Sequence, residues 1–125
     1  MARTALVVDD SMLIRHAVCR YLEERGFAVE SATNGHEALG MVGTVLPDLI
    51  ITDLVMPGMD GQELIKRLKA SPQTAEIPIV VLAGKRSAPG DSDKYANSVI
   101  YKDIDIESQL AKALNAALGE NVITD

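Results

Sequence analysis

Four ionisable side chains lie where short apolar runs end, and together they could do chemistry: Asp9, Asp10, Asp53 and Lys102. Clustered carboxylates repel one another, so each is costly unless it is protonated or paired with a cation. Mg²⁺ is a natural partner, because this hard ion prefers oxygen ligands and takes one or two carboxylates. A metal ion and an ammonium group beside a carboxylate suit phosphoryl transfer, since the transferred oxygens need neutralising. The carboxylate is ionised at neutral pH and can itself be the nucleophile, giving an aspartyl-phosphate.

The stretch from Leu49 to Gly61 must place the central carboxylate. Its apolar, β-branched start is too short for a helix and predicts a buried strand that ends at Asp53. Asp60 is suited to cap a helix that begins near Gly61. In open α/β sheets the carboxyl end of a buried strand borders the ligand crevice.

The same patterns predict further elements along the chain. Strands are expected over the following runs: Thr4–Val8, Phe27–Ala32, Leu49–Asp53, Ile77–Ala83 and Val99–Tyr101. Helices are expected from a Ser11 cap to Gly26 and over three later segments: His36–Val45, Gly61–Ala70 and Ile106–Leu118. Residues 84–97 contain Pro89 and Gly90 but too few apolar residues to define a helix face, so the fourth helix is expected to be degenerate.

Alternating strands and helices predict an α/β fold, a flavodoxin-like, doubly wound parallel sheet of five strands. If the strand order is 2-1-3-4-5, the strands that deliver Asp9, Asp10 and Asp53 are neighbours, and their carboxylates converge. We expect one domain over residues 1–119 and a polar tail over residues 120–125.

Composition narrows the class of protein. The 125 residues are 47% hydrophobic and 24% charged, which is typical of a folded domain rather than a disordered chain. The formal charge of −6 argues against direct binding to nucleic acid or to an anionic membrane. The single cysteine, Cys19, excludes an internal disulfide. Apolar runs are only strand-length and no signal peptide is apparent, so a cytoplasmic location is expected.

The motifs V-V-D-D-S and D-L-V-M-P-G-M-D-G, followed by Lys102 after a short strand, resemble the CheY-like response-regulator receiver domain of two-component signalling. The resemblance covers Thr4 to Leu118. It implies that Asp53 is the phospho-acceptor, that Asp9 and Asp10 hold Mg²⁺, and that Lys102 pairs with the phosphoryl group. It further implies that Asp53 and the backbone carbonyl of Val55 are metal ligands. The implied partner is a histidine kinase or phosphotransfer protein, which supplies the phosphoryl group from phosphohistidine, together with a downstream protein target.

Three positions depart from the family pattern. Ala83 stands where the family usually has Thr or Ser, Val99 stands at the aromatic switch position, and Asp103 replaces a proline that follows the lysine. We therefore expect an altered output switch. Val55 and Lys85 occupy positions that tune the phosphoryl lifetime, and an apolar Val55 predicts a long-lived phospho-form.

Other functions remain open at this stage. A pseudo-receiver would act as a phosphorylation-independent interaction module, although the intact acidic set argues against it. A phosphatase of the haloacid-dehalogenase type needs a second Asp at the position of Val55. A nucleotide-binding protein needs a phosphate-cradling loop, whereas Asn34-Gly35 is better interpreted as a turn.

The remaining polar and sulfur-containing residues favour structural interpretations. His16 and His36 are expected to be exposed, and Lys66, Arg67 and Lys69 to form a solvated helix face. We expect packing roles for Cys19 and for four methionines: Met12, Met41, Met56 and Met59. By resemblance to the family, a kinase would dock over the first helix, where Arg15, Val18 and Cys19 could contribute.

Overall fold

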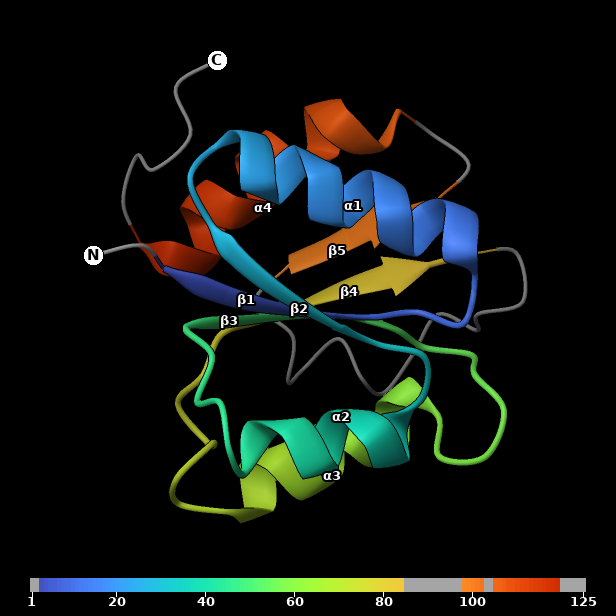
Figure 1. Ribbon diagram of the computed structural model, residues 1–125, viewed down its shortest axis with the longest axis vertical. Helices are drawn as coiled ribbons and strands as arrows, with labels where there is room; N and C mark the ends of the chain where they lie inside the picture. The colour runs from blue at the N-terminus through green and yellow to red at the C-terminus, as the bar shows by residue number, and fades with distance from the viewer. Residues whose placement is uncertain (1–2, 85–97, 103–104, 120–125) are drawn as a thin grey trace.

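The computed structural model describes residues 3–84, 98–102 and 105–119, which form a three-layered α/β domain (Figure 1). The strands are β1 (Thr4–Val8), β2 (Ala28–Ala32), β3 (Leu49–Asp53), β4 (Ile79–Ala83) and β5 (Ser98–Tyr101). The helices are α1 (Met12–Glu24), α2 (Gly35–Val42), α3 (Gly61–Ala70) and α4 (Ile106–Leu118). The sheet is parallel, with the order β2-β1-β3-β4-β5, so the predicted fold class and strand order are confirmed.

Polar side chains at the helix starts define where the helices begin. Ser11, Asn34 and Asp60 each accept a hydrogen bond from the backbone N–H three residues further along the chain. The Asn34 cap places the start of α2 one residue before the prediction, so the predicted turn is also the helix cap. At the other end of α1, Gly26 adopts a positive φ of 91°, which a residue without Cβ accepts readily.

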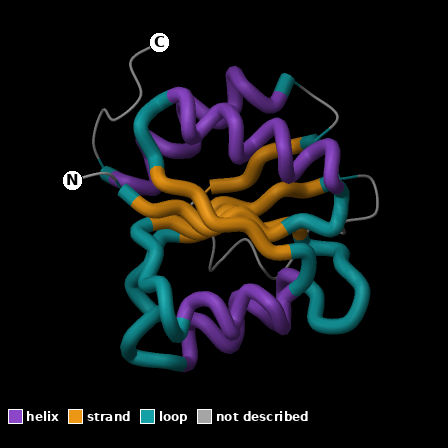
Figure 2. The backbone as a smooth tube through the Cα atoms, in the orientation of Figure 1, coloured by secondary structure: helices purple, strands orange, loops and turns teal. Residues whose placement is uncertain are grey.

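Helices cover both faces of the sheet, α1 and α4 on one and α2 and α3 on the other (Figures 1 and 2). The central strands β3 and β4 are therefore buried over their whole length, as expected for a parallel sheet inside two helical layers. Successive residues of β3 face opposite layers: Leu49 and Ile51 pack on the α1–α4 side, and Ile50 packs on the α2–α3 side.

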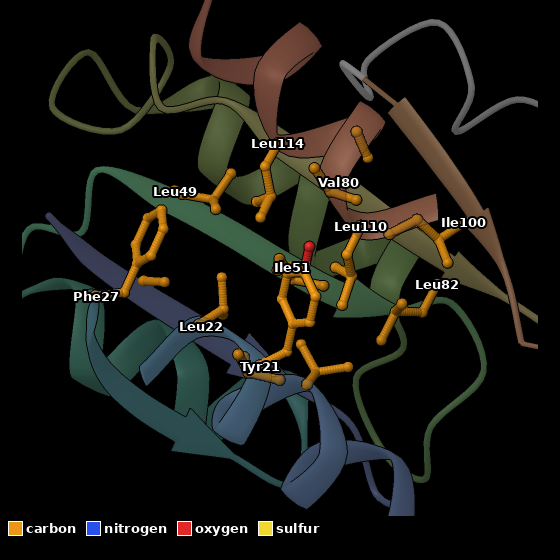
Figure 3. Close-up of a cluster of buried hydrophobic side chains, with 14 residues drawn as sticks. Tyr21, Leu22, Phe27, Leu49, Ile51, Val80, Leu82, Ile100, Leu110 and Leu114 are labelled. Carbon is orange, nitrogen blue, oxygen red and sulfur yellow. The ribbon is translucent and has the colours of Figure 1, made fainter. Parts of the chain in front are cut away.

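The α1–α4 layer contributes aliphatic and aromatic side chains to one cluster, in which Leu110 and Leu114 lie against Ile51, Val80 and Ile100 (Figure 3). Each of these five side chains is fully buried. Among the described residues, no helix is both long enough and apolar enough to cross a membrane.

Several predictions need correction. Strands β2 and β4 begin later than predicted, at Ala28 and Ile79. Helix α2 ends at Val42, with Gly43 as its C-cap, rather than at the predicted Val45. Met12, expected to pack, is 72% exposed, since it lies at the open start of α1. The predicted degenerate fourth helix and the tail over residues 120–125 fall outside the described residues, apart from Gly84.

Candidate functional site

The first carboxylate of the site follows β1. Strand β1 pairs with β3 in parallel register, with Val8 beside Thr52, so Asp9 and Asp53 emerge at the same edge of the sheet. The Asp9 residue is fully buried, and its Oδ1 accepts a hydrogen bond of 2.8 Å from the backbone N–H of Ser11. The guanidinium Nη1 of Arg15 donates to the backbone carbonyl of Asp9 at 2.9 Å. The turn that contains Asp9 and Asp10 is therefore held in place by hydrogen bonds to Ser11 and to Arg15 of α1.

The second carboxylate, Asp53, is the last residue of β3 and is only 2% exposed. Its Oδ1 lies 3.4 Å from the backbone nitrogen of Val55, which donates a long hydrogen bond. Gly61 begins α3 directly against this strand end, and a Cβ there would lie 2.0 Å from the Asp53 carbonyl oxygen. The chain can bring α3 this close only because residue 61 has no side chain.

The ammonium group of Lys102 lies between the two buried carboxylates. Its Nζ is 2.9 Å from Oδ2 of Asp9 and 3.0 Å from Oδ2 of Asp53, and the side chain is 18% exposed. The Lys102 backbone N–H donates to the carbonyl of Ala83 at 2.8 Å, which attaches the end of β5 to β4. Three strands that are far apart in sequence thus deliver one cation and two anions to one point.

Burial and charge act on these groups in opposite directions. Burial raises the pKa of Asp53 above its ordinary value, and the negative charge of Asp9 adds to that rise, although contact with Lys102 lowers the pKa in part. Burial alone would lower the pKa of Lys102, but hydrogen bonds and charge interactions with Asp9 and Asp53 outweigh it and raise that pKa. Lys102 is therefore held as a cation, whereas ionisation of Asp53 carries an electrostatic cost.

The same edge of the sheet fits a divalent cation. Carboxylate oxygens of Asp9, Asp10 and Asp53 lie within 4.8 Å of one another, and Asp10 is exposed to solvent. Oδ2 of Asp9 and Oδ2 of Asp53 accept no hydrogen bond within the described part of the chain beyond their ion pairs with Lys102. Three carboxylates thus face one ammonium group, which leaves excess negative charge and free lone pairs for Mg²⁺.

The structure therefore brings together four of the five residues predicted for the site, namely Asp9, Asp10, Asp53 and Lys102. Val55, the fifth, is half-buried two residues beyond Asp53. Lys85 and Asp103 lie outside the described residues.

Three contributors to the site are not predicted by the sequence. Arg15 hydrogen-bonds to the Asp9 carbonyl, a role separate from the contribution to kinase docking that the resemblance implies, which stays a prediction. The sequence predicts Gly61 only as a helix start and predicts no role for Gln109, which hydrogen-bonds to the residue before Lys102. Of these three roles, only that of Gly61 could have been predicted from the sequence, because a glycine directly after a helix cap suggests that another backbone segment approaches closely.

The comparisons with known proteins agree with this geometry. A model of the response regulator receiver domain matches residues 5–115. The phosphate regulon transcriptional regulatory protein PhoB of Escherichia coli is 40% identical over 85 residues, which is 68% of this chain. The match spans only 37% of the length of PhoB.

Two solved structures extend the likeness to the backbone. The chemotaxis response regulator CheY4 of Vibrio cholerae is 30% identical, with a TM-score of 0.80 over 93% of this chain and 99% of that one. The receiver domain of a signal transduction histidine kinase from Syntrophus aciditrophicus is 34% identical, with a TM-score of 0.82 over 94% of this chain and 91% of that one.

Proposed function

The chain belongs to the response regulator receiver domain family, and on that premise we propose that it accepts a phosphoryl group on Asp53 in two-component signalling. Receiver domains are signalling modules rather than classical enzymes. The observation that carries the proposal is the buried Asp53 carboxylate, which lies 3.0 Å from the Lys102 ammonium group and beside Asp9 and Asp10. Membership of this family argues against the two alternative functions, a phosphatase and a nucleotide-binding protein.

In the proposed reaction a carboxylate oxygen of Asp53 attacks the phosphorus of a phosphohistidine on a kinase or phosphotransfer protein. An O–P bond forms, the P–N bond breaks, and its electron pair returns to the imidazole nitrogen. Asp53 needs no general base because it attacks as the carboxylate. Lys102 faces the oxygen of Asp53 and neutralises negative charge on the transferred group.

We assign Mg²⁺ to the carboxylates of Asp9, Asp10 and Asp53, with the backbone carbonyl of Val55 as a further ligand. When bound, the ion offsets the charge of the phosphoryl oxygens. Asp10 is the exposed member of the set, so Asp10→Asn removes a ligand without leaving an unpaired group in the core. We expect the Mg²⁺ concentration for half-maximal phosphorylation to rise by about tenfold or more, measured from initial rates across a magnesium titration.

The direct test is intact mass spectrometry after incubation with Mg²⁺ and acetyl phosphate. We expect one added phosphoryl group in the native chain and none in Asp53→Asn or in the presence of a chelator. Glu76→Gln, a change to an exposed carboxylate in the turn before β4, is the matched control and should be phosphorylated normally. A folded protein that accepts no phosphoryl group from acetyl phosphate or a phosphohistidine donor would instead be a phosphorylation-independent interaction module.

We further propose that the output switch is altered. Ala83 is buried at the end of β4 and offers a methyl group where a hydroxyl would bind a phosphoryl oxygen, and its carbonyl accepts from Lys102. Val99 is half-buried against the α2–α3 cluster, whereas Tyr101 is 51% exposed. Phosphorylation of the native chain should therefore shift few backbone amide resonances in β4 and β5. Ala83→Thr should shift more of them, and equal responses would count against this switch assignment.

The wider context is also inferred. We propose a single domain over residues 1–119, which the family match over residues 5–115 supports. We also propose a cytoplasmic location and a partner that is a histidine kinase or phosphotransfer protein, and membership of the family supports both. The formal charge of −6 argues against direct nucleic-acid binding by this domain.

A further inference from the structure

The end of β5 depends on one side chain from α4. Within the described residues, strand β5 lies at the edge of the sheet and pairs with β4 alone. Lys102 uses its backbone N–H toward β4, so the N–H and C=O groups of Tyr101 point to the outer edge. Unpaired groups there would fray the strand directly before the functional lysine.

The carboxamide of Gln109 fills this gap. Its Oε1 accepts from the backbone N–H of Tyr101 at 2.9 Å, and its Nε2 donates to the Tyr101 carbonyl at 2.9 Å. The same Nε2 donates to the carbonyl of Asp105 at 3.1 Å. The backbone partners fix the orientation of the amide, because an N–H faces the oxygen and two carbonyls face the nitrogen. One side chain thus pairs with Tyr101 as a neighbouring strand would.

These bonds tie together both ends of the connection that contains Lys102. Tyr101 precedes the lysine and Asp105 caps α4 after it. The Tyr101 side chain is 51% exposed and cannot anchor the strand end by burial. Neither Lys102 nor Asp103 is a proline, so no ring restricts the backbone at this point. Among the described residues, the Gln109 amide is the contact that pairs with the outer edge of β5 at Tyr101.

We propose that Gln109 is a positioning residue: it pairs with the Tyr101 backbone and so holds Lys102 where its ammonium group contacts both Asp9 and Asp53. The two ion-pair distances of 2.9 and 3.0 Å leave little room for displacement. A misplacement of about 1 Å in such a group costs on the order of a hundredfold in rate. For the phosphoryl chemistry, this inference rests on the proposed function.

Two variants separate the hydrogen bonds from the shape of the side chain. Gln109→Met keeps the length and helix propensity but removes both the donor and the acceptor. Gln109→Glu keeps the outline but turns a carboxylate oxygen toward the carbonyls of Tyr101 and Asp105. Gln73→Glu is the control, since it makes the same chemical change at an exposed position in the turn between α3 and β4.

Amide hydrogen exchange measured by NMR tests the proposal without any phosphoryl donor. We expect the Lys102 amide, which is bonded to Ala83 rather than to Gln109, to exchange about tenfold faster in both Gln109 variants. The buried amide of Ile51 in β3 should be unaffected, and Gln73→Glu should match the native protein. Faster exchange at Tyr101 with unchanged exchange at Lys102 would show that the strand end keeps its place without Gln109, and would overturn the proposal.

Phosphorylation kinetics supply the second readout. With acetyl phosphate and saturating Mg²⁺, we expect both variants to react about tenfold more slowly at an unchanged half-saturating Mg²⁺ concentration, because β1 and β3 carry the metal ligands. A purely structural role would lower thermal stability and leave this rate unchanged in the folded protein, which would also overturn the proposal. If the native chain accepts no phosphoryl group, the proposed function fails, yet hydrogen exchange still decides whether Gln109 holds Lys102.

Discussion

At the scale of single residues, Asp53 lowers the stability of the fold in which it works. Its pKa is raised by burial above 3.8, the ordinary value, so the folded state binds a proton more readily than the unfolded chain does. The carboxylate therefore destabilises the fold once pH rises above 3.8. A stability cost of this kind is common at functional sites and accords with the proposed role of Asp53.

Asp53→Asn should consequently raise the melting temperature at neutral pH, since it removes a buried charge and keeps the shape of the side chain. The gain should shrink as pH falls through the raised pKa of Asp53, because the native carboxylate is then protonated too. Thermal unfolding of both proteins across acidic and neutral pH checks this. Glu76→Gln, a change to an exposed carboxylate in the turn before β4, controls for loss of net charge. A variant less stable than the native chain at neutral pH would contradict the expected sign.

We expect Val55 to set the lifetime of the phospho-form. Its side chain is apolar and half-buried beside Asp53, so it has no group to orient an attacking water. We expect a phospho-form that persists well beyond seconds, and Val55→Glu should shorten its lifetime by about tenfold or more, since an oriented base accelerates proton transfer. Loss of the label over time, followed by mass spectrometry, measures both lifetimes, and Val55→Leu should behave like the native chain.

At the scale of elements, the junction between β3 and α3 is set by close packing of backbone. The Gly61 N–H donates to the Leu54 carbonyl at 2.9 Å, and no Cβ fits beside the carbonyl of Asp53. The sheet and the first turn of α3 are thus held together directly behind Asp53. A distortion of the backbone at Gly61 would therefore act directly on the peptide unit that joins Asp53 to Leu54.

Gly61→Ala should therefore cost about 2–4 kcal/mol of unfolding free energy and slow phosphorylation of Asp53. Gly40→Ala is the matched control, because a Cβ at this helical glycine meets no atom within 4 Å. That change should be neutral or should stabilise the protein by about 0.5–1 kcal/mol. Urea unfolding measures both. Equal effects at the two glycines would mean that the close approach at Gly61 carries no energetic weight.

At the scale of the whole molecule, the sheet separates two hydrophobic cores, one against α1 and α4 and the other against α2 and α3. Ile65 of α3 is 1% exposed in the α2–α3 cluster, and Ile100 of β5 is fully buried in the α1–α4 cluster. Each core is covered by its own pair of helices (Figure 2). Small losses of packing in one layer should then leave the other layer unaffected.

Ile65→Val and Ile100→Val should each cost about 0.5–1.5 kcal/mol. In the double variant the losses should add to within about 0.5 kcal/mol, since distant sites without shared partners are nearly independent. Chemical unfolding of the four proteins of this cycle provides the measurement. A larger coupling would show that the sheet transmits packing strain between its faces.

The sequence by itself determined the elements and the residues at their ends. Periodicity, helix caps and the acidic ends of two strands depend on neighbours a few residues away, so α3 and β3 begin and end as expected, and Asp53 ends β3. Alternation of strands with helices predicted a parallel sheet, and the order 2-1-3-4-5 was taken from known doubly wound folds. The predicted element boundaries were wrong where a loop contact sets the boundary. Phe27 is an example, because its backbone N–H donates to the Leu22 carbonyl and the residue does not join β2.

Only the tertiary structure decided how the site is held. Lys102 lies between Asp9 and Asp53, Arg15 hydrogen-bonds to the Asp9 carbonyl, and Gln109 pairs with Tyr101. Each contact joins residues whose distance depends on how separate helices and strands pack. Each contact also depends on the rotamer of a long side chain, which the local sequence pattern does not encode. The residue types at the site were thus readable from the chain, whereas the contacts that give them their geometry and charge state arise from packing.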